Sequence, residues 1–326
     1  MNRDSFYRIV EWNIIPCGGT KEVFNKKKIL NYEINKHSSE TISNEKKAVL
    51  RKTLLEMVEE IDSICRKHDI KLFLVGGSLL GAIRHKGFIP WDDDVDFGMS
   101  RKDYKKFISI FEQEFSDKFY MRCPNTPYPN GNRFMQIYKK NTVLETIEGS
   151  NPLQPKCLAI DIFPYDYAPN NYMVRQIKGL VCNALMFIAS SVTNRAFPNE
   201  QYEDILSKSV SGKLFYLLEK LTGFLFSWRN PTKWFDTVDK AIQQKNKSMY
   251  ITSATGRKHY LGECFKKEIF FPLHEIQFEN IYLYAPQNSV AYLKKMYGNT
   301  FMDLPPEDER ESHFITKFEV LDEEQL

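Results

Sequence analysis

Apolar residues at steps of three and four predict two amphipathic helices in the first third of the chain. The first begins at about Asn44, and either Ser43 or Asn44 can cap it. The residues before it are polar with irregular Gly and Asn, which is typical of an extended lead-in. The apolar positions are Leu50, Leu54, Met57, Val58, Ile61, Ile64 and Cys65 in the first helix, and Tyr104, Phe107, Ile108, Phe111 and Phe115 in the second.

Short apolar runs predict strands between and after these helices. The run KLFLV at residues 71–75 stops at two glycines, which favours a buried strand, a tight turn and then a short helix over residues 78–84. Residues 85–91 contain Gly87 and Pro90 and predict a loop. Val95, Phe97 and Met99 alternate with polar positions, as in a half-buried strand. Further strands are expected at residues 119–123, 133–138 and 157–163.

The pattern becomes mainly helical from about Pro164 to Gln244, and mixed strand and helix signals return from Tyr250. The fold class predicted is therefore α/β (α+β), with a mixed-sheet core, a helical insertion and a C-terminal segment. We divide the chain into a lead-in (1–43), a core (44–165), a helical insertion (166–244) and a C-terminal part (245–326).

Composition narrows the class of protein. Of the 326 residues, 42 % are hydrophobic and 27 % charged, which is close to globular averages and sufficient for a buried core. The formal net charge is only +3. This value argues against a dedicated nucleic-acid binder, because such domains are strongly basic. It leaves room for small anionic substrates, which a few local cations can bind.

The cysteines and the N-terminus indicate a cytoplasmic protein. The six cysteines stand singly, without the paired spacing of a zinc site, so free thiols in a reducing compartment are expected. The first residues lack the basic head and long apolar run of a secretory signal. The six are Cys17, Cys65, Cys123, Cys157, Cys182 and Cys264.

Two apolar stretches bear on membrane contact. Residues 179–192 form a run of about 14, short of the ~20 that a bilayer span needs, so we expect a buried helix. Residues 214–228 are apolar and aromatic but contain Glu219 and Lys220. Either stretch could rest on a membrane surface if the substrate of the protein is linked to a lipid. Peripheral contact at the inner face of the membrane is therefore one of the expectations.

Four carboxylates crowd into five positions at Asp92, Asp93, Asp94 and Asp96. Their mutual repulsion is relieved by a divalent cation, and Mg²⁺ is commonly held by one or two carboxylates plus substrate phosphates. On a strand, residues i and i+2 share a face, so Asp94 and Asp96 can converge on one ion while Asp93 points away. Asp92 could join the site or cap a loop. A solvated acidic turn is the alternative reading.

Gly76, Gly77 and Ser78 lie at the strand-to-helix turn just upstream of these acids. Glycines there let backbone N–H groups approach a phosphate, and the helix dipole favours an anion. Alone the glycine pair is a weak signal. Followed about sixteen residues later by an Asp-x-Asp strand, it predicts a phosphate cradle beside a metal site.

Asp161 is a candidate third acid. It lies in the apolar run AIDIF, where a carboxylate is costly unless it is paired or metal-bound. As a third ligand it could also act as general base toward an attacking hydroxyl. An edge-strand Asp facing water is the alternative.

Arg84, His85 and Lys86 lie between the glycines and the acids. Cations in this position could neutralise charge on phosphate oxygens during transfer. The alternative is a set of solvated surface residues, and His85 is the weakest of the three candidates.

Residues 76–107, GGSLLGAIRHKGFIPWDDDVDFGMSRKDYKKF, closely resemble the signature of the LicD family in the nucleotidyltransferase-fold superfamily, of which fukutin and fukutin-related protein are distant relatives. The IDIFP run at 160–164, Tyr297-Gly298 and Leu304-Pro305-Pro306 resemble further family elements. The resemblance covers residues from about 44 to 313, least strongly in the helical middle.

The resemblance implies transfer of a phospho-alcohol, typically phosphocholine from CDP-choline, onto a hydroxyl of a cell-surface glycan. Fukutin-type relatives use CDP-ribitol. By position, Asp94 and Asp96 would bind Mg²⁺, or Mn²⁺ in its place, with Asp92 as an adjunct and Asp161 as the third acid. Gly77 and Ser78, beside Gly76, would hold donor phosphate. The partners implied are a CDP-alcohol donor and a glycan or lipid-linked glycan acceptor.

Two other functions remain open from the sequence. A nucleotidyltransferase would attack the α-phosphorus and release pyrophosphate, whereas phospho-alcohol transfer releases CMP; the fold supports both. A non-catalytic partner in glycan assembly would keep the cradle without turnover, and the intact acids argue against it. A nucleic-acid substrate is disfavoured by the near-neutral charge.

Overall fold

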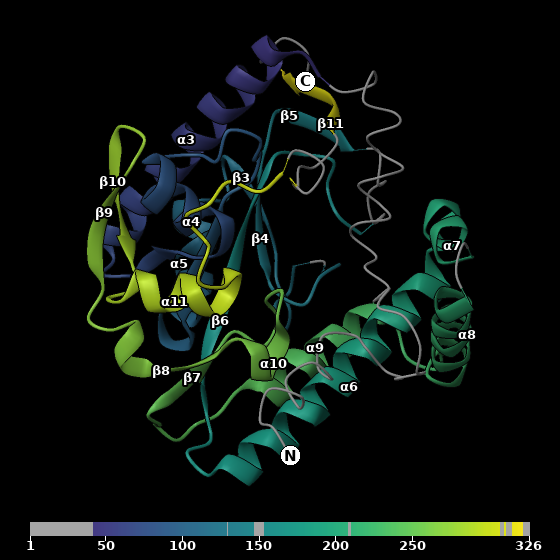
Figure 1. Ribbon diagram of the computed structural model, residues 1–326. Helices are drawn as coiled ribbons and strands as arrows, with labels where there is room; N and C mark the ends of the chain where they lie inside the picture. Colours follow the sequence, from purple (N-terminus) through teal and green to yellow (C-terminus); the bar gives the residue numbers. More distant parts are fainter. Residues whose placement is uncertain are drawn as a thin grey trace.

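The computed structural model describes residues 42–128, 130–146, 153–207, 210–306, 310 and 315–321 (Figure 1). Nearly all of the expected lead-in, and Cys17 with it, lies outside these ranges. Within them, nine strands form one mixed sheet with the path β3-β4-β6-β2-β1-β10-β9, and β7 and β8 extend it from β6. The α/β class with a mixed sheet is thereby confirmed.

The strands come from both halves of the chain. The sheet contains β1 (Leu72–Leu74), β2 (Asp96–Ser100), β3 (Phe119–Arg122), β4 (Met135–Lys139), β6 (Ala159–Ala168), β7 (Tyr250–Thr252), β8 (Cys264–Lys266), β9 (His274–Phe278) and β10 (Ile281–Ala285). A separate ribbon pairs β5 (Thr142–Thr146) with β11 (Ile315–Val320). Because β10 pairs with β1, the C-terminal part shares a sheet with the core. The division into four parts stays a prediction.

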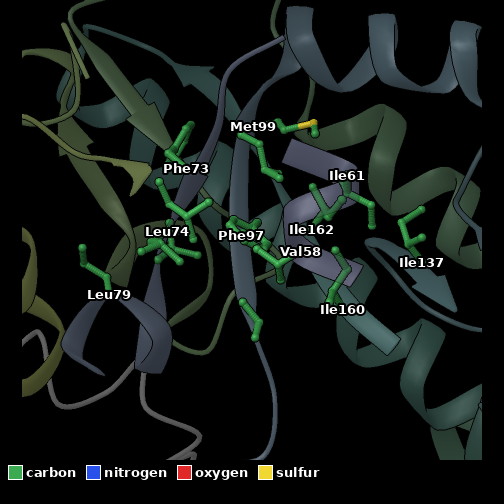
Figure 2. Close-up of a cluster of buried hydrophobic side chains, with 14 of the residues drawn as sticks. Val58, Ile61, Phe73, Leu74, Leu79, Phe97, Met99, Ile137, Ile160 and Ile162 are labelled. Carbon is green, nitrogen blue, oxygen red and sulfur yellow. The ribbon is translucent and has the colours of Figure 1, made fainter. Parts of the chain in front are cut away.

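The two amphipathic helices are present as expected. Helix α3 (Asn44–Lys67) is capped by Ser43, whose Oγ accepts a hydrogen bond from the Lys46 N–H. Helix α5 (Arg101–Glu114) buries Tyr104, Phe107 and Phe111, and Phe115 follows as its C-terminal cap. In Figure 2, Val58 and Ile61 of α3 lie among apolar side chains of the sheet. The apolar spacing therefore does set the face that each helix buries.

Helix α4 (Gly76–His85) begins two residues earlier than predicted. The two glycines are its first residues rather than a turn before it, and Val75 is the N-cap. Strand β2 also differs, since it begins at Asp96 and leaves Asp94 in the preceding loop. The prediction that Asp94 and Asp96 share one face of a strand is therefore wrong, because only Asp96 lies on the strand.

Strand β6 continues through Pro164 to Ala168, four residues past the end of the IDIFP run. The expectation that the helical region starts directly after Pro164 is wrong. Pro164 is paired with Met99 of β2 on one side. On its other side it lies between the positions that pair with β4 (159–162) and those that pair with β7 (166–168), where no partner strand requires a donor. The ribbon of β5 and β11 was also not foreseen.

The helical region contains α6 (Tyr172–Ala196), α7 (Glu200–Ser207), α8 (Val210–Leu225) and α9 (Pro231–Ile242). Figure 1 shows α6 running below the sheet toward α7 and α8, with α9 beside it. In the C-terminal part, α10 (His259–Gly262) and α11 (Ser289–Tyr297) join the strands described above. A second apolar core lies between α6, α9 and α10.

Candidate active site

Asp96 and Asp161 lie side by side on neighbouring strands. Strands β2 and β6 are parallel, and these two residues are direct partners in the register. Partners in a parallel pair project to the same face. Phe97 and Ile162, one position on, are fully buried on the opposite face. The apolar neighbours Ile160 and Ile162 are thus buried in the core, while Asp161 projects to the opposite face.

The start of α4 touches the carboxylates directly. Gly76 has a φ of +55°, and a Cβ there would lie 2.7 Å from Asp96 Oδ2. A Cβ on Gly77 would lie 3.0 Å from Asp92 Oδ2. Only glycine combines this backbone conformation with so close an approach. The glycines and the acids that they approach, fifteen and twenty residues apart in sequence, therefore form one site.

Ser78 ties α4 to the acid strand. Its Oγ accepts a hydrogen bond of 2.8 Å from the Asp96 N–H, and the Val75 N–H donates to the Asp96 carbonyl at 3.1 Å. Ser78 is buried. The hydroxyl thus fixes the first residue of β2 against the helix. Its predicted contact with donor phosphate stays a prediction.

Gln136 holds the Asp161 carboxylate in place. The residue sits on β4, opposite Asp161 in the register, and its Nε2 donates to Asp161 Oδ1 at 2.8 Å. Its Oε1 accepts from Tyr138 Oη at 2.7 Å and from Gln154 Nε2 at 2.6 Å. The amide is therefore locked in one orientation. Sequence reasoning missed Gln136, although a lone amide between the buried residues of this strand was a signal.

Arg51 of α3 holds the loop that carries Asp92. Its guanidinium donates to the carbonyls of Ile89, Pro90 and Asp92 at 2.6–3.2 Å. Three carbonyls on one planar donor fix the path of the chain just before the acids. No motif marked this arginine, because its partners lie about forty positions away.

Arg84, His85 and Lys86 lie at the far end of α4. Six residues separate Ser78 from Arg84, which is roughly 9 Å along a helix. The Arg84 Nη1 donates to the carbonyls of Phe301 and Asp303, and its Nε donates to His85 Nε2. Burial, followed by the Arg84 charge, lowers the pKa of His85. These contacts fasten the C-terminal segment, and the substrate role of the three residues stays a prediction.

The C-terminal part closes one side of the site. Tyr292 of α11 accepts a hydrogen bond of 3.0 Å from the Gly76 N–H. Burial raises the pKa of Tyr297, and the negative charges of Asp96 and Asp92 raise it further. These charges act on Tyr297 because the Tyr-Gly motif lies beside the acids. Two motifs that are two hundred residues apart thus belong to one site.

Glu263 is a buried carboxylate on the side of the site that Tyr292 and Tyr297 close. Burial raises its pKa to about 7. The Lys258 N–H donates to its Oε1 at 2.9 Å, and a Cβ on Gly256 would lie 2.4 Å from either carboxylate oxygen. Glu263 also acts electrostatically on Tyr297 and Tyr292. Nothing in the sequence pattern distinguished this glutamate.

The donor set suits a hard divalent cation. Among the residues that the structure describes, no three His, Cys, Asp or Glu side chains gather closely enough to hold a metal ion by themselves. Mg²⁺ does not require such a cage, because it is often bound by one or two carboxylates together with substrate phosphates. The neighbouring carboxylates of Asp96 and Asp161 fit that mode.

Comparison with known proteins finds relatives over the segment that carries these residues. The family model described as LicD/FKTN/FKRP, nucleotidyltransferase domain, matches residues 69–182, which contain both acids and the glycines. The chain is 28 % identical over 282 residues to the lipopolysaccharide cholinephosphotransferase LicD of Haemophilus influenzae, covering 85 % of this chain and 100 % of that protein. It is 40 % identical over 52 residues to the ribitol 5-phosphate transferase FKRP of Homo sapiens, covering 16 % of this chain and 10 % of the relative.

Proposed function

Because this chain belongs to the LicD/FKTN/FKRP nucleotidyltransferase domain family, we propose that it transfers phosphocholine, or another phospho-alcohol, from a CDP-alcohol donor to a hydroxyl of a cell-surface glycan. It is a transferase of phosphorus-containing groups. Similarity to a lipopolysaccharide cholinephosphotransferase over its whole length supports phosphocholine as the group and a glycan of the lipopolysaccharide, teichoic acid or capsule type as the acceptor.

The observation that carries the proposal is the pairing of Asp96 with Asp161 against the first residues of α4. Phosphoryl transfer needs little covalent help from a protein, and most of the rate comes from positioning and electrostatic stabilisation. Backbone N–H groups at the start of a helix favour an anion. In the proposed complex the donor diphosphate lies against Gly76, Gly77 and Ser78, in reach of both carboxylates.

Asp96 and Asp161, together with donor phosphate oxygens, would hold Mg²⁺ or Mn²⁺, with Asp94 and Asp92 of the loop before β2 as adjuncts. When bound, the cation supplies positive charge to the donor diphosphate and the leaving CMP. Asp161 would accept the proton of the acceptor hydroxyl as that oxygen attacks the distal phosphorus. Gln136 orients the carboxylate for this role through its bond to Oδ1. At the margin of the site, negative charge on the phosphate oxygens would be neutralised by Arg84, His85 and Lys86.

The proposal also places the reaction in the cytoplasm, with peripheral contact at the inner face of the membrane. The cysteines in the described part of the chain support a reducing compartment, since Cys65, Cys123, Cys157, Cys182 and Cys264 are free thiols.

Product analysis tests the proposed reaction. The purified protein is incubated with Mg²⁺, a panel of CDP-alcohols and a glycan acceptor, and the small product is identified by mass spectrometry. Release of CMP with a phospho-alcohol on the glycan supports the proposal. Release of pyrophosphate from a nucleoside triphosphate, with a nucleotide left on the acceptor, would instead establish the nucleotidyltransferase reaction. Binding without turnover would indicate the glycan-assembly partner.

Three isosteric variants test the site itself. We expect Asp96→Asn and Asp161→Asn each to lower kcat by at least about 10²-fold, since general acid–base groups contribute about 10²–10⁴-fold. Asp93→Asn is the matched control, because it removes a neighbouring charge from the same acidic run without touching either strand position. Full turnover in Asp161→Asn would remove Asp161 from the mechanism.

A further inference from the structure

Helix α8 exposes its large apolar side chains to solvent and buries small and polar residues instead. Its buried residues are two glycines and a glutamate, Gly212, Glu219 and Gly223. Its large apolar side chains point to solvent, and each of the following is at least 41 % exposed: Leu214, Leu217, Leu218, Leu221, Phe224 and Leu225. A helix of a water-soluble domain normally buries its apolar stripe. A contiguous exposed apolar face marks a binding surface, whereas single exposed leucines do not.

The orientation of α8 is fixed by specific contacts. The Glu219 carboxylate accepts hydrogen bonds from Tyr202 Oη at 2.7 Å and Asn194 Nδ2 at 3.3 Å. A Cβ on Gly223 would lie 2.6 Å from the Ser191 carbonyl oxygen of α6, so only glycine fits between the two helices. Rotation of α8 to bury its leucines would break these bonds and force a large side chain into the glycine contact. The exposed face is thus built into the fold.

The first half of α6 adds a second apolar surface. Met173, Ile177 and Leu180 are each at least 59 % exposed. In the part of the chain that the structure describes, α6 is the one helix whose length and composition would let it cross a bilayer. It is nevertheless tied into the domain, because Lys178 Nζ donates to the Gln243 carbonyl and Gly179 packs against Leu261. The stretch 179–192, for which a buried helix was expected, is helical and contains every buried residue of α6, but the helix is 25 residues long and its first turns are exposed.

The cations of α6 and α8 outnumber their carboxylates, although the neighbouring helix α7 is acidic and its Glu203 pairs with Lys220 at 3.1 Å. Helix α6 carries Arg175, Lys178 and Arg195 and no acidic residue. Helix α8 carries exposed Lys213 and Lys220, and its one carboxylate, Glu219, points inward. Trp228, 72 % exposed, follows the helix. Apolar side chains flanked by cations and an exposed tryptophan are the composition of helices that lie in the interface of an anionic bilayer.

We propose that the outward face of α8, together with the first half of α6, docks on the surface of an anionic lipid bilayer. Both helices lie on the surface and neither spans it. Strand β6, which carries Asp161, ends at Ala168, and α6 begins at Tyr172. Docking would therefore hold β6 at a short, fixed distance from the lipid surface. The proposal does not rest on the transfer reaction, since lipid binding is measured without substrate.

Vesicle flotation of the full chain tests the proposal. We expect the protein to float with vesicles of phosphatidylglycerol and phosphatidylcholine, and less with phosphatidylcholine alone or at high salt. The triple variant Leu217→Gln, Leu221→Gln, Phe224→Gln should bind at least about tenfold more weakly, because binding scales with the apolar area buried. Val49→Gln with Tyr282→Gln is the matched control, which removes exposed apolar side chains elsewhere and should float as before.

Four outcomes would overturn the proposal. The first is a triple variant that keeps its thermal unfolding midpoint and floats like the parent protein. The second is a parent protein whose dimer, seen by light scattering, is lost in the triple variant, since the face then binds a second copy. The third is vesicle binding only after removal of residues 1–41, which would make that segment the occupant. The fourth is extraction from membranes by detergent but not by alkaline carbonate, which would indicate a spanning helix.

Discussion

At the scale of single residues, Asp161 depends on an amide to fix its direction. Gln136 donates to one carboxylate oxygen, and two further side chains hold the amide. A base that must reach one proton gains most from such restraint. We expect Gln136→Leu to lower kcat by about 10–100-fold with little change in KM, the usual cost of removing a partner of a site carboxylate.

Tyr138→Phe should have a smaller effect, because it removes one bond to the amide but leaves the amide in place. Steady-state kinetics with a CDP-alcohol donor measure both. Gln277→Leu, on edge strand β9, is the control and should match the parent protein. A rise in KM at constant kcat in Gln136→Leu would mean that the residue binds substrate rather than positioning the acid.

Glu263 couples folding to pH. Its folded pKa of about 7 lies above the ordinary value of 4.5, so the folded protein keeps a proton that the unfolded chain has lost between these pH values. Stability from this group is therefore present below about pH 4.5 and lost as pH rises through 7. Glu263→Gln keeps the acceptor for the Lys258 N–H and cannot ionise.

We expect the variant to gain roughly 3 kcal/mol over the parent protein between pH 4.5 and pH 8. Urea unfolding at several pH values measures this difference. The variant is compared with the parent protein at each pH because His259 also titrates. Burial lowers the pKa of His259 to about 4, so its contribution to the free energy of unfolding changes with pH in the opposite direction, equally in both proteins. A difference in the free energy of unfolding between the two proteins that does not change with pH would show that Glu263 ionises normally.

At the scale of elements, one half-buried arginine joins the helical region to the core. Arg101 at the start of α5 donates through Nε and Nη2 to Asp166 of β6, and through Nη1 to Asp239 of α9 at 2.7 Å. Removing it leaves two buried carboxylates without their counter-ion. We expect Arg101→Ala to lower the free energy of unfolding by about 3–5 kcal/mol.

Arg101→Lys should restore only part of this loss, because lysine cannot bind both carboxylates with a planar fork. Urea unfolding monitored by circular dichroism measures the change. Lys105→Ala, exposed on the same helix, is the control and should alter stability little. An Arg101→Ala protein with the parent midpoint would show that α9 is attached by apolar packing alone.

Elements with a strong local pattern were predictable, and those set by distant partners were not. Helices α3 and α5 follow from their apolar spacing, and β1 from four apolar residues before a glycine pair. The ribbon of β5 and β11 joins segments about 170 residues apart, so no local pattern reveals it. For α8 the apolar spacing is regular but predicts the wrong buried face, because Glu219 and the glycines face inward and the leucines face solvent.

At the scale of the whole molecule, the candidate site is assembled from segments that the sheet brings together. The glycines and the Asp92–Asp96 run were predictable because a local motif contains both. Asp161 was predictable from its apolar surroundings. Gln136, Arg51 and Glu263 were not, because each acquires its role through a contact with a segment far along the chain.

A site built from α4, β2, β6 and α11 predicts that ligand binding stabilises the whole domain. A ligand that binds only the folded state adds about 2.7 kcal/mol at one hundred times its Kd. For a chain of 326 residues, each kcal/mol raises Tm by roughly 1.5 °C, because the unfolding entropy grows with length. With Mg²⁺ and saturating CDP-choline, we therefore expect Tm to rise by about 4 °C.

Differential scanning calorimetry measures the shift, and three comparisons assign it. EDTA should abolish most of it, because the diphosphate would then meet the carboxylates of Asp96 and Asp161 without a counter-ion. Asp96→Asn should respond less than the parent protein to Mg²⁺ with the donor, whereas Asp93→Asn should respond fully. Phosphocholine alone should give little shift, since it lacks the cytidine diphosphate that the start of α4 would bind. An equal shift in EDTA would separate donor binding from the acids and leave the glycines as a site on their own.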